Sequence, residues 1–105
     1  MMILFDQGTP VPLRRYLCDH DVETAFERGW SHLRNGTLLD RLEAEGFELL
    51  ITTDQSLHHQ QNLAKRPFSV LVLMSTSWPQ IEKQVKKIVD AIERITPSEY
   101  VQIQI

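Results

Sequence analysis

The sequence predicts an α/β fold, specifically a three-layer α/β/α sandwich around a mainly parallel central sheet. Two short segments, residues 2–5 and 49–51, contain only apolar residues. Runs of this kind are typical of strands buried on both faces, as in a parallel sheet covered by helices. The strand-like segments also alternate with segments that carry helical signals. Such alternation favours a parallel sheet with helices on both sides.

Length and composition narrow the classes of protein to consider. A chain of 105 residues is sufficient for one domain with one core, so we expect a single domain over residues 1–105. The formal net charge of -3 argues against a protein that coats nucleic acid through phosphate neutralisation. Cys18 is the only cysteine, which excludes an internal disulfide framework and a thiolate zinc cluster. With no basic leader and no apolar stretch of about 18 residues, we expect a cytoplasmic protein without a membrane span.

The first half of the chain is expected to contain three strands and their connections. Residues 2–5 form the first strand, and Thr9-Pro10 begins a helical segment whose apolar face includes Leu13. A turn then leads to a short strand at residues 22–24, followed by a helical segment that ends at Gly29. Asn35 is the expected N-cap of a helix that ends at Gly46. The third strand is expected at residues 48–52.

The second half of the chain is expected to contain the remaining strands and the longest helix. Residues 57–64, with the polar run 58–62 in their middle, predict a short helical turn, and residues 68–74 predict a central strand. Ser77 and Gln80 have the spacing of a capping box at the start of a helix that runs to Ile95 and is stopped by Thr96-Pro97. Residues 100–105 alternate polar and apolar, which is typical of a half-buried edge strand.

Two aspartates occupy equivalent positions in this series of elements. Asp6 follows the first strand directly, and Asp54 follows Thr52-Thr53 after the third. Ligands of parallel sheets bind beyond the carboxyl ends of the strands, so both carboxylates are expected in one site. Carboxylates gathered in one cleft repel each other unless a cation or a proton lies between them. A divalent metal site is therefore the first hypothesis.

The chain resembles the small PIN-like proteins of prokaryotes, which are related to the PIN-domain ribonucleases of toxin–antitoxin pairs. The resemblance extends from Ile3-Leu4-Phe5-Asp6 through the helix at residues 35–46 to the strand at residues 68–74, and the Thr52-Thr53-Asp54 motif is its most specific part. It implies a PIN-like fold and an RNA-cleaving enzyme that uses magnesium or manganese. Asp6 and Asp54 would be the catalytic metal ligands. A small antitoxin and a second copy of the chain are the implied protein partners.

Two positions depart from the pattern of that family. Asn35 and Ser56 stand where many relatives have acids. Their oxygens can still bind a hard cation, and magnesium usually relies on one or two carboxylates together with waters and substrate phosphates. Asn35 is thus a weak third catalytic residue. The alternative is a catalytically degenerate module that binds RNA or a protein partner without hydrolysis.

Each candidate also has an ordinary structural explanation. Asp6 can bond backbone amides in the turn before Thr9, and Asp54 can cap the helical turn that starts near Leu57. Asn35 serves as an N-cap whether or not it lies near a metal. On the polar side of the same helix, Asp40 and Glu43 are either solvated charges or substitute acids for the site.

Further residues are candidates for contacts with RNA. Two tryptophans can either stack on bases or close the edge of the core. The adjacent His58 and His59 point in different directions on a helix, so a zinc site is not expected, and a general base near Asp54 is the remaining functional reading. The segment Ile3–Thr9 also looks like the start of a haloacid-dehalogenase phosphatase, although Gly8 replaces the second aspartate of that motif. The candidate substrate-binding residues are Arg14, Lys65, Arg66 and Ser56, and the two tryptophans are Trp30 and Trp78.

Overall fold

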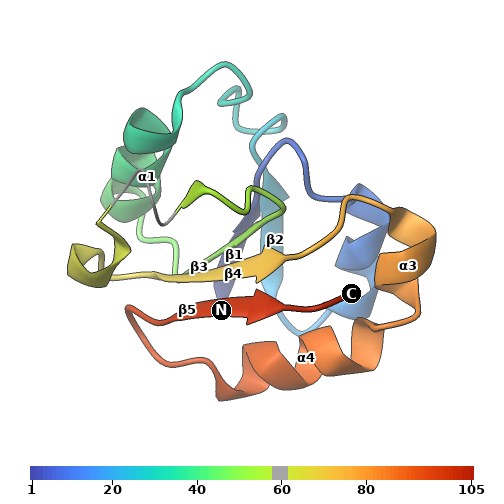
Figure 1. The fold of residues 1–105 in the computed structure, drawn as a ribbon. Coiled ribbons are helices and arrows are strands. Elements are labelled where there is room, and N and C mark those ends of the chain that lie inside the picture. The colour runs from blue at the N-terminus through green and yellow to red at the C-terminus, as the bar shows by residue number, and fades with distance from the viewer. Residues whose placement is uncertain (58–61) are drawn as a thin grey trace.

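The computed structural model, which describes residues 1–57 and 62–105, contains one parallel sheet with the order β2-β1-β3-β4-β5 (Figure 1). Every pair of neighbouring strands is parallel, which confirms the predicted α/β class. The bounds agree with those expected from sequence to within two residues. The strands are β1 (Met2–Phe5), β2 (Asp21–Thr24), β3 (Leu49–Thr52), β4 (Ser69–Leu73) and β5 (Tyr100–Ile103).

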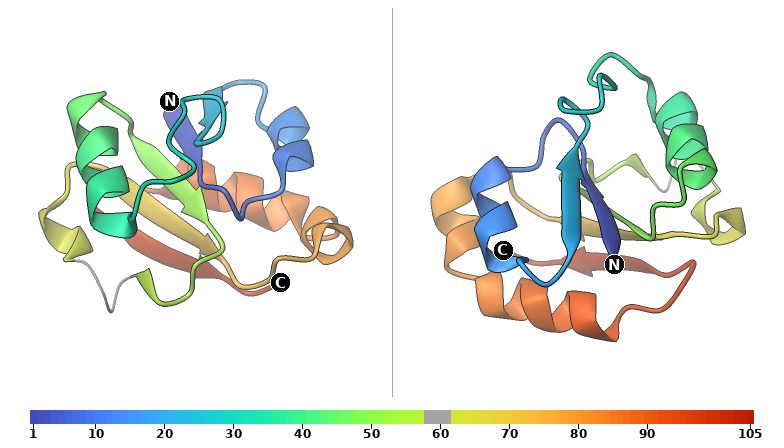
Figure 2. Two further views of the ribbon diagram at one scale, coloured as in Figure 1. Left: turned by 90° about the horizontal axis from the view of Figure 1, so that it is seen from above. Right: turned by 180° about the vertical axis from the view of Figure 1, so that it is seen from behind.

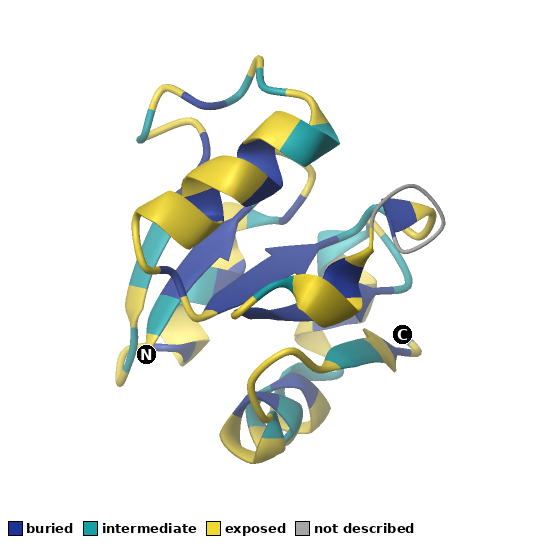
Figure 3. Ribbon diagram, turned by 90° about the vertical axis from the view of Figure 1, so that its left-hand side faces the viewer, coloured by how far each residue is buried: buried dark blue, intermediate teal, exposed yellow. Residues whose placement is uncertain are grey.

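Both faces of the sheet are covered, so the molecule has three layers (Figure 2). Successive strand residues point to opposite faces, and this places Leu4 and Leu50 in one apolar cluster and Ile3 and Ile51 in another. The first cluster packs under α1 (Asn35–Ala44), and the second packs against α4 (Val85–Arg94) and the 3₁₀ helix η1 (Val11–Tyr16). Figure 3 shows the buried sheet between the exposed outer sides of the helices.

Helix α1 begins one residue earlier than the sequence predicts. Arg34 is the N-cap and Asn35 is the first helical residue, so the prediction that Asn35 caps this helix is wrong. The backbone is extended at Arg34 and helical from Asn35 onward, and within the first turn the Asn35 side-chain amide donates to Asp54. The predicted end is confirmed, since Gly46 adopts φ of 75° after the last turn.

The single helix expected between Ser77 and Ile95 is divided in two. Helix α3 (Trp78–Glu82) ends before α4 begins, and Gln84 between them has φ of -112°. Ser77 is the N-cap of α3, but its side chain makes no capping hydrogen bond, so the capping-box prediction is wrong. The predicted apolar face is confirmed because Ile81, Ile88 and Ile92 are buried.

Two strand predictions are refined by the topology. All five residues of β4 are buried, but β3 and not β4 is the middle strand of the sheet. The predicted terminal edge strand is confirmed, because β5 pairs with β4 alone. The predicted helical turn over residues 57–64 is described only at its ends, where η2 (Leu63–Lys65) is a 3₁₀ turn, and His58 and His59 lie outside the described residues. Among the described residues, no helix is long and apolar enough to cross a membrane.

Candidate functional site

The strand order brings Asp6 and Asp54 to the same edge of the sheet. From β1 the chain crosses to β2 on one side and later returns to β3 on the other, which makes the gap between β1 and β3 the topological switch point. Asp6 directly follows β1 and is tied to β3 by a hydrogen bond of 3.2 Å from its amide to the Ile51 carbonyl. Asp54 lies two residues beyond the end of β3. The two carboxylates are therefore neighbours, as the sequence predicts.

Asp6 is partly buried and receives three hydrogen bonds. The Thr52 hydroxyl donates to Oδ2, while the Thr9 hydroxyl (2.8 Å) and the Gly8 amide (3.2 Å) donate to Oδ1. Burial raises the pKa of Asp6 above its ordinary value, and the negative charge of Asp54 adds to this shift; the hydrogen bonds oppose it without cancelling it. Asp6 thus lies in a site that favours a proton or a cation beside its carboxylate.

Asp54 has the opposite electrostatic character. Its Oδ1 accepts hydrogen bonds from the Ser56 amide (3.0 Å) and hydroxyl (2.8 Å), and its Oδ2 accepts one from Asn35 Nδ2 (3.1 Å). Burial alone would raise the pKa of Asp54, but these hydrogen bonds outweigh it and lower the pKa. The Thr52 hydroxyl connects the two acids, because it donates to Asp6 and accepts from the Asp54 amide at 3.0 Å.

Gly8 lies close to the Thr53 side chain of the loop after β3. A Cβ atom at this position would lie 2.6 Å from Oγ1 of Thr53, closer than van der Waals contact permits. Any acid at position 8 would meet the same obstacle. The second aspartate of a haloacid-dehalogenase motif would therefore require Thr53 to move.

We predict that Gly8→Ala lowers the free energy of unfolding by about 1–3 kcal/mol, because the added methyl group must displace Thr53 or the Asp6 turn. Urea denaturation of the variant measures this loss. The double variant Gly8→Ala/Thr53→Ala removes the hydroxyl that the methyl group meets and should recover most of the stability. Equal losses in the single and double variants would contradict the proposed contact.

The residues present fit a single divalent cation at the lower limit of what such a site needs. A carboxylate has about four lone-pair positions, and donors among the described residues use three on Asp6 and three on Asp54. With these donors each acid can supply one further bond, and magnesium often takes one or two carboxylates with waters and phosphates for the rest. Among the described residues, no group of three or more His, Cys, Asp or Glu side chains is placed to hold a metal.

The predicted substrate-binding residues divide into two groups. Ser56 bonds Asp54, and Arg14 lines a cleft with Asp6, although its guanidinium is held by Glu27 at 2.6 and 3.2 Å. Lys65 and Arg66 precede β4 and so lie toward the amino edge of the parallel sheet, away from the acids.

The two acids of α1 that were candidate substitutes for a metal ligand form ion pairs with Arg66 instead. Asp40 and Glu43 both contact Arg66, at 2.7 and 3.2 Å, and these ion pairs raise the pKa of the guanidinium. Asp40 lies in the middle of the helix and Glu43 in its last turn, whereas Asn35 at the N-terminal end meets Asp54. The possibility that Asp40 or Glu43 substitutes for a missing metal ligand is therefore not supported by the geometry.

Two tryptophans take the ordinary role that the sequence left open. Trp30 is buried and makes an edge-to-face contact with Phe47 at 6.0 Å between ring centroids. Trp78 is partly buried against the core and contacts Tyr16 at 6.3 Å. Both rings thus take part in apolar packing, Trp30 within the core and Trp78 at its edge.

Sequence reasoning missed the buried threonines that surround Asp6. Thr9 and Thr52 are 4% and 1% exposed, and both hydroxyls bond the carboxylate. A useful signal was the position of Thr52 at the end of an otherwise apolar strand, where a buried hydroxyl needs a partner.

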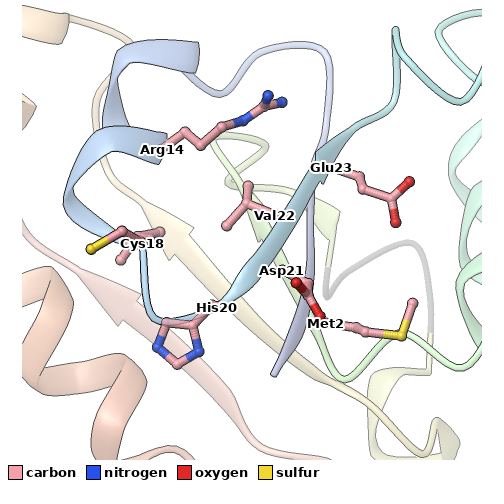
Figure 4. A pocket seen from close by; sticks show the side chains of 8 residues that line it. Met2, Arg14, Cys18, His20, Asp21, Val22 and Glu23 are labelled. Carbon is pink, nitrogen blue, oxygen red and sulfur yellow. The ribbon is translucent and has the colours of Figure 1, made fainter.

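Three concave regions are lined mainly by residues from the N-terminal part of the chain. Clefts of ≈ 360 and ≈ 140 Å³ both border Asp6. A third, of ≈ 530 Å³, surrounds the edge strand β2 and includes Cys18 and His20 (Figure 4). In Figure 4, Val22 and Glu23 lie on opposite sides of β2, so the residues around this third region do not converge on one point. The two clefts at Asp6 are therefore the better candidates for ligand binding.

Comparison of the chain with family models, with characterised proteins and with solved structures finds no match in any of the three. The fold and the pair of acids at the switch point are therefore the basis for inferring a function.

Proposed function

We propose that this protein is a PIN-like ribonuclease that cleaves single-stranded RNA with a magnesium or manganese ion held by Asp6 and Asp54. The observation that carries the proposal is the convergence of these two acids at the carboxyl ends of β1 and β3. Burial and mutual charge raise the pKa of Asp6, and a cation between the two acids would relieve both effects. Catalytic sites commonly contain groups perturbed in this way.

The protein residues have distinct roles in this proposal. Asp6 and Asp54 bind the cation, which would activate water and neutralise charge on the phosphodiester. Asn35 and Ser56 orient the Asp54 carboxylate through the hydrogen bonds described above, and Thr52 orients Asp6. Asn35 therefore acts chiefly as a positioning residue in place of a third acid. A site with two carboxylates fits one weakly bound cation better than a two-metal centre.

A non-catalytic binding module is the second candidate, and one observation favours it. Protein donors already satisfy three lone-pair positions on each acid, so the hydrogen bonds alone account for both side chains as turn residues. Under this reading the fold binds RNA or a protein partner and has lost hydrolysis.

The proposal also includes the partners that a toxin of this class would need. We propose a cytoplasmic toxin that is neutralised by a small antitoxin protein. We propose that a homodimer forms along β5, the terminal strand of the sheet, which among the described strands pairs with β4. A monomer in sedimentation velocity at high micromolar concentration would remove the homodimer from this proposal.

The enzyme and binding-module readings differ in one measurement. We predict that the purified protein cleaves labelled single-stranded RNA in millimolar Mn²⁺ or Mg²⁺ and not in EDTA, and that Asp54→Asn abolishes cleavage because one of two cation ligands is lost. The variant should fold but be less stable by about 1 kcal/mol, since it loses charge-assisted hydrogen bonds.

Asp40→Asn is the matched control, because it removes a carboxylate from the middle of α1 that forms an ion pair with Arg66. Cleavage should be unchanged in this variant. RNA binding without cleavage under all conditions would favour the binding module, and metal-dependent cleavage that survives Asp54→Asn would exclude Asp54 as a ligand.

A further inference from the structure

The turn after β2 presents an aromatic side chain to solvent beside the acidic site. Phe26 is 81% exposed, more than any other large apolar side chain noted among the described residues. It lines the ≈ 360 Å³ cleft together with Val11, which is 53% exposed. Asp6 forms another part of the same cleft. Exposed apolar side chains gathered next to a polar centre are characteristic of binding surfaces.

The turn that carries Phe26 is held in place by hydrogen bonds on both sides of it. The Glu27 carboxylate accepts from the Thr24 amide at 3.0 Å, and the Thr24 hydroxyl accepts from the Glu27 amide at 3.1 Å, which is the reciprocal pattern of a capping box. Arg14 adds two hydrogen bonds to Glu27. The exposed position of Phe26 is thus built into an ordered turn that faces the cleft.

Polar atoms in the wall of this cleft have hydrogen-bonding capacity that the protein does not use. Among the described residues, Ser31 Oγ and Arg14 Nε are shielded from solvent and have no hydrogen-bond partner. Ser31 borders both clefts that contain Asp6. A hydroxyl can donate and accept, so it suits the mixed donors and acceptors on the edge of a nucleobase.

We propose that Phe26 is the stacking platform for one nucleobase of a single-stranded RNA whose backbone passes the Asp6 and Asp54 site. This inference rests on the proposed function and supplies its means of binding substrate. The chain carries a net charge of -3, and Arg14 is neutralised by Glu27, so phosphate contacts are a poor source of affinity. Base stacking does not depend on net charge, and every base offers a planar face. A cleft of ≈ 360 Å³ is within the range of small-ligand sites.

The test compares two labelled oligonucleotides of equal charge in EDTA, where no metal-dependent cleavage occurs. Hexa-adenylate provides bases, and an abasic hexamer provides only the sugar-phosphate chain. The wild-type protein should bind hexa-adenylate more tightly by fluorescence anisotropy. Phe26→Ala should raise the Kd for hexa-adenylate about 10-fold and leave the Kd for the abasic hexamer unchanged. Phe26→Leu should behave like Phe26→Ala because it lacks a planar ring, whereas Phe26→Trp should retain or strengthen binding.

Tyr16→Ala is the control, since it removes another exposed aromatic residue that does not line this cleft. Equal binding of the two oligonucleotides by the wild type, or hexa-adenylate binding unchanged in Phe26→Ala, would overturn the inference. If Phe26→Ala instead alters only the sedimentation of the free protein, the surface is a self-association contact and the inference is also overturned. Binding that depends on Phe26 but is not followed by cleavage in Mn²⁺ would support stacking and exclude the ribonuclease. Cleavage in Mn²⁺ at the same rate in the wild type and in Phe26→Ala would support the ribonuclease and overturn the stacking inference.

Discussion

Asp6→Asn is expected to abolish RNA cleavage and, at pH 7, to make the protein more stable than the wild type. Burial raises the pKa of Asp6, so the ionised carboxylate at neutral pH costs folding free energy. Asparagine has no charge to desolvate. Its carbonyl can accept from the Gly8 amide and the Thr9 hydroxyl, and its amide can donate to Thr52 Oγ1. We expect the free energy of unfolding to rise by about 1 kcal/mol, or the Tm by about 5 °C.

The pH dependence of this difference gives a sharper test than its size. The pKa of Asp6 is raised in the folded protein. Its favourable contribution to the free energy of unfolding is therefore complete below the ordinary pKa of aspartate, and it is lost as the pH rises through the pKa that Asp6 has in the folded protein. The gain from Asp6→Asn should thus be small in acid, increase through that window and then level off. Asp54, with its lowered pKa, loses its own contribution to stability as the pH falls in both proteins, so only its repulsion with Asp6 enters the difference between them.

Asp19→Asn is the control for the Asp6 variant, because Asp19 is exposed in the loop before β2. It should leave cleavage and the stability at pH 7 unchanged. A gain for Asp6→Asn that is equally large at all pH values would mean that the ionisation of Asp6 is not its cause. A loss of stability at pH 7 would show that the hydrogen bonds of the ionised carboxylate outweigh the cost of burying it.

Asn35→Asp is expected to strengthen cation binding and to lower the stability of the metal-free protein. Asn35 Nδ2 lies 3.1 Å from Asp54 Oδ2, so the new carboxylate would lose this hydrogen bond and face a like charge. In EDTA we expect a loss of about 1–3 kcal/mol in the free energy of unfolding. In millimolar Mn²⁺ a third acid should lower the Kd of the ion at least about 10-fold and recover much of that loss by binding the folded state.

Asn35→Ala separates the two effects, because it removes the hydrogen bond without adding charge. This variant should be destabilised in EDTA and should gain no more from Mn²⁺ than the wild type. Thermal unfolding of the three proteins over a Mn²⁺ titration measures all of these quantities. If Mn²⁺ raised the Tm of Asn35→Asp no more than that of Asn35→Ala, the proposed cation position between Asp6 and Asp54 would be wrong.

Local sequence determined the layers of this protein and the edge on which its acids lie. An apolar run such as Met2–Phe5 removes its side chains from water only when both faces of the strand are covered. Alternate residues of each strand then contact helices on opposite sides of the sheet. An acid that directly follows such a strand in a parallel sheet falls at the carboxyl edge with the others. The positions of Asp6 and Asp54 therefore follow from periodicity and from the alternation of strands with helices.

Tertiary structure alone decided which groups those acids meet. Asp6 bonds Thr52, 46 residues away, and Asp54 bonds Asn35, 19 residues away, and Asn35 is the first residue of α1 and not its cap. The opposite pKa shifts of two aspartates with similar local sequence positions arise from these partners and from unequal burial. Strand order has the same origin, because pairing energies between distant segments select β3 and not β4 as the middle strand. Local propensity describes neighbours along the chain, whereas burial, charge and hydrogen bonding in this site depend on residues that only the folded chain brings together.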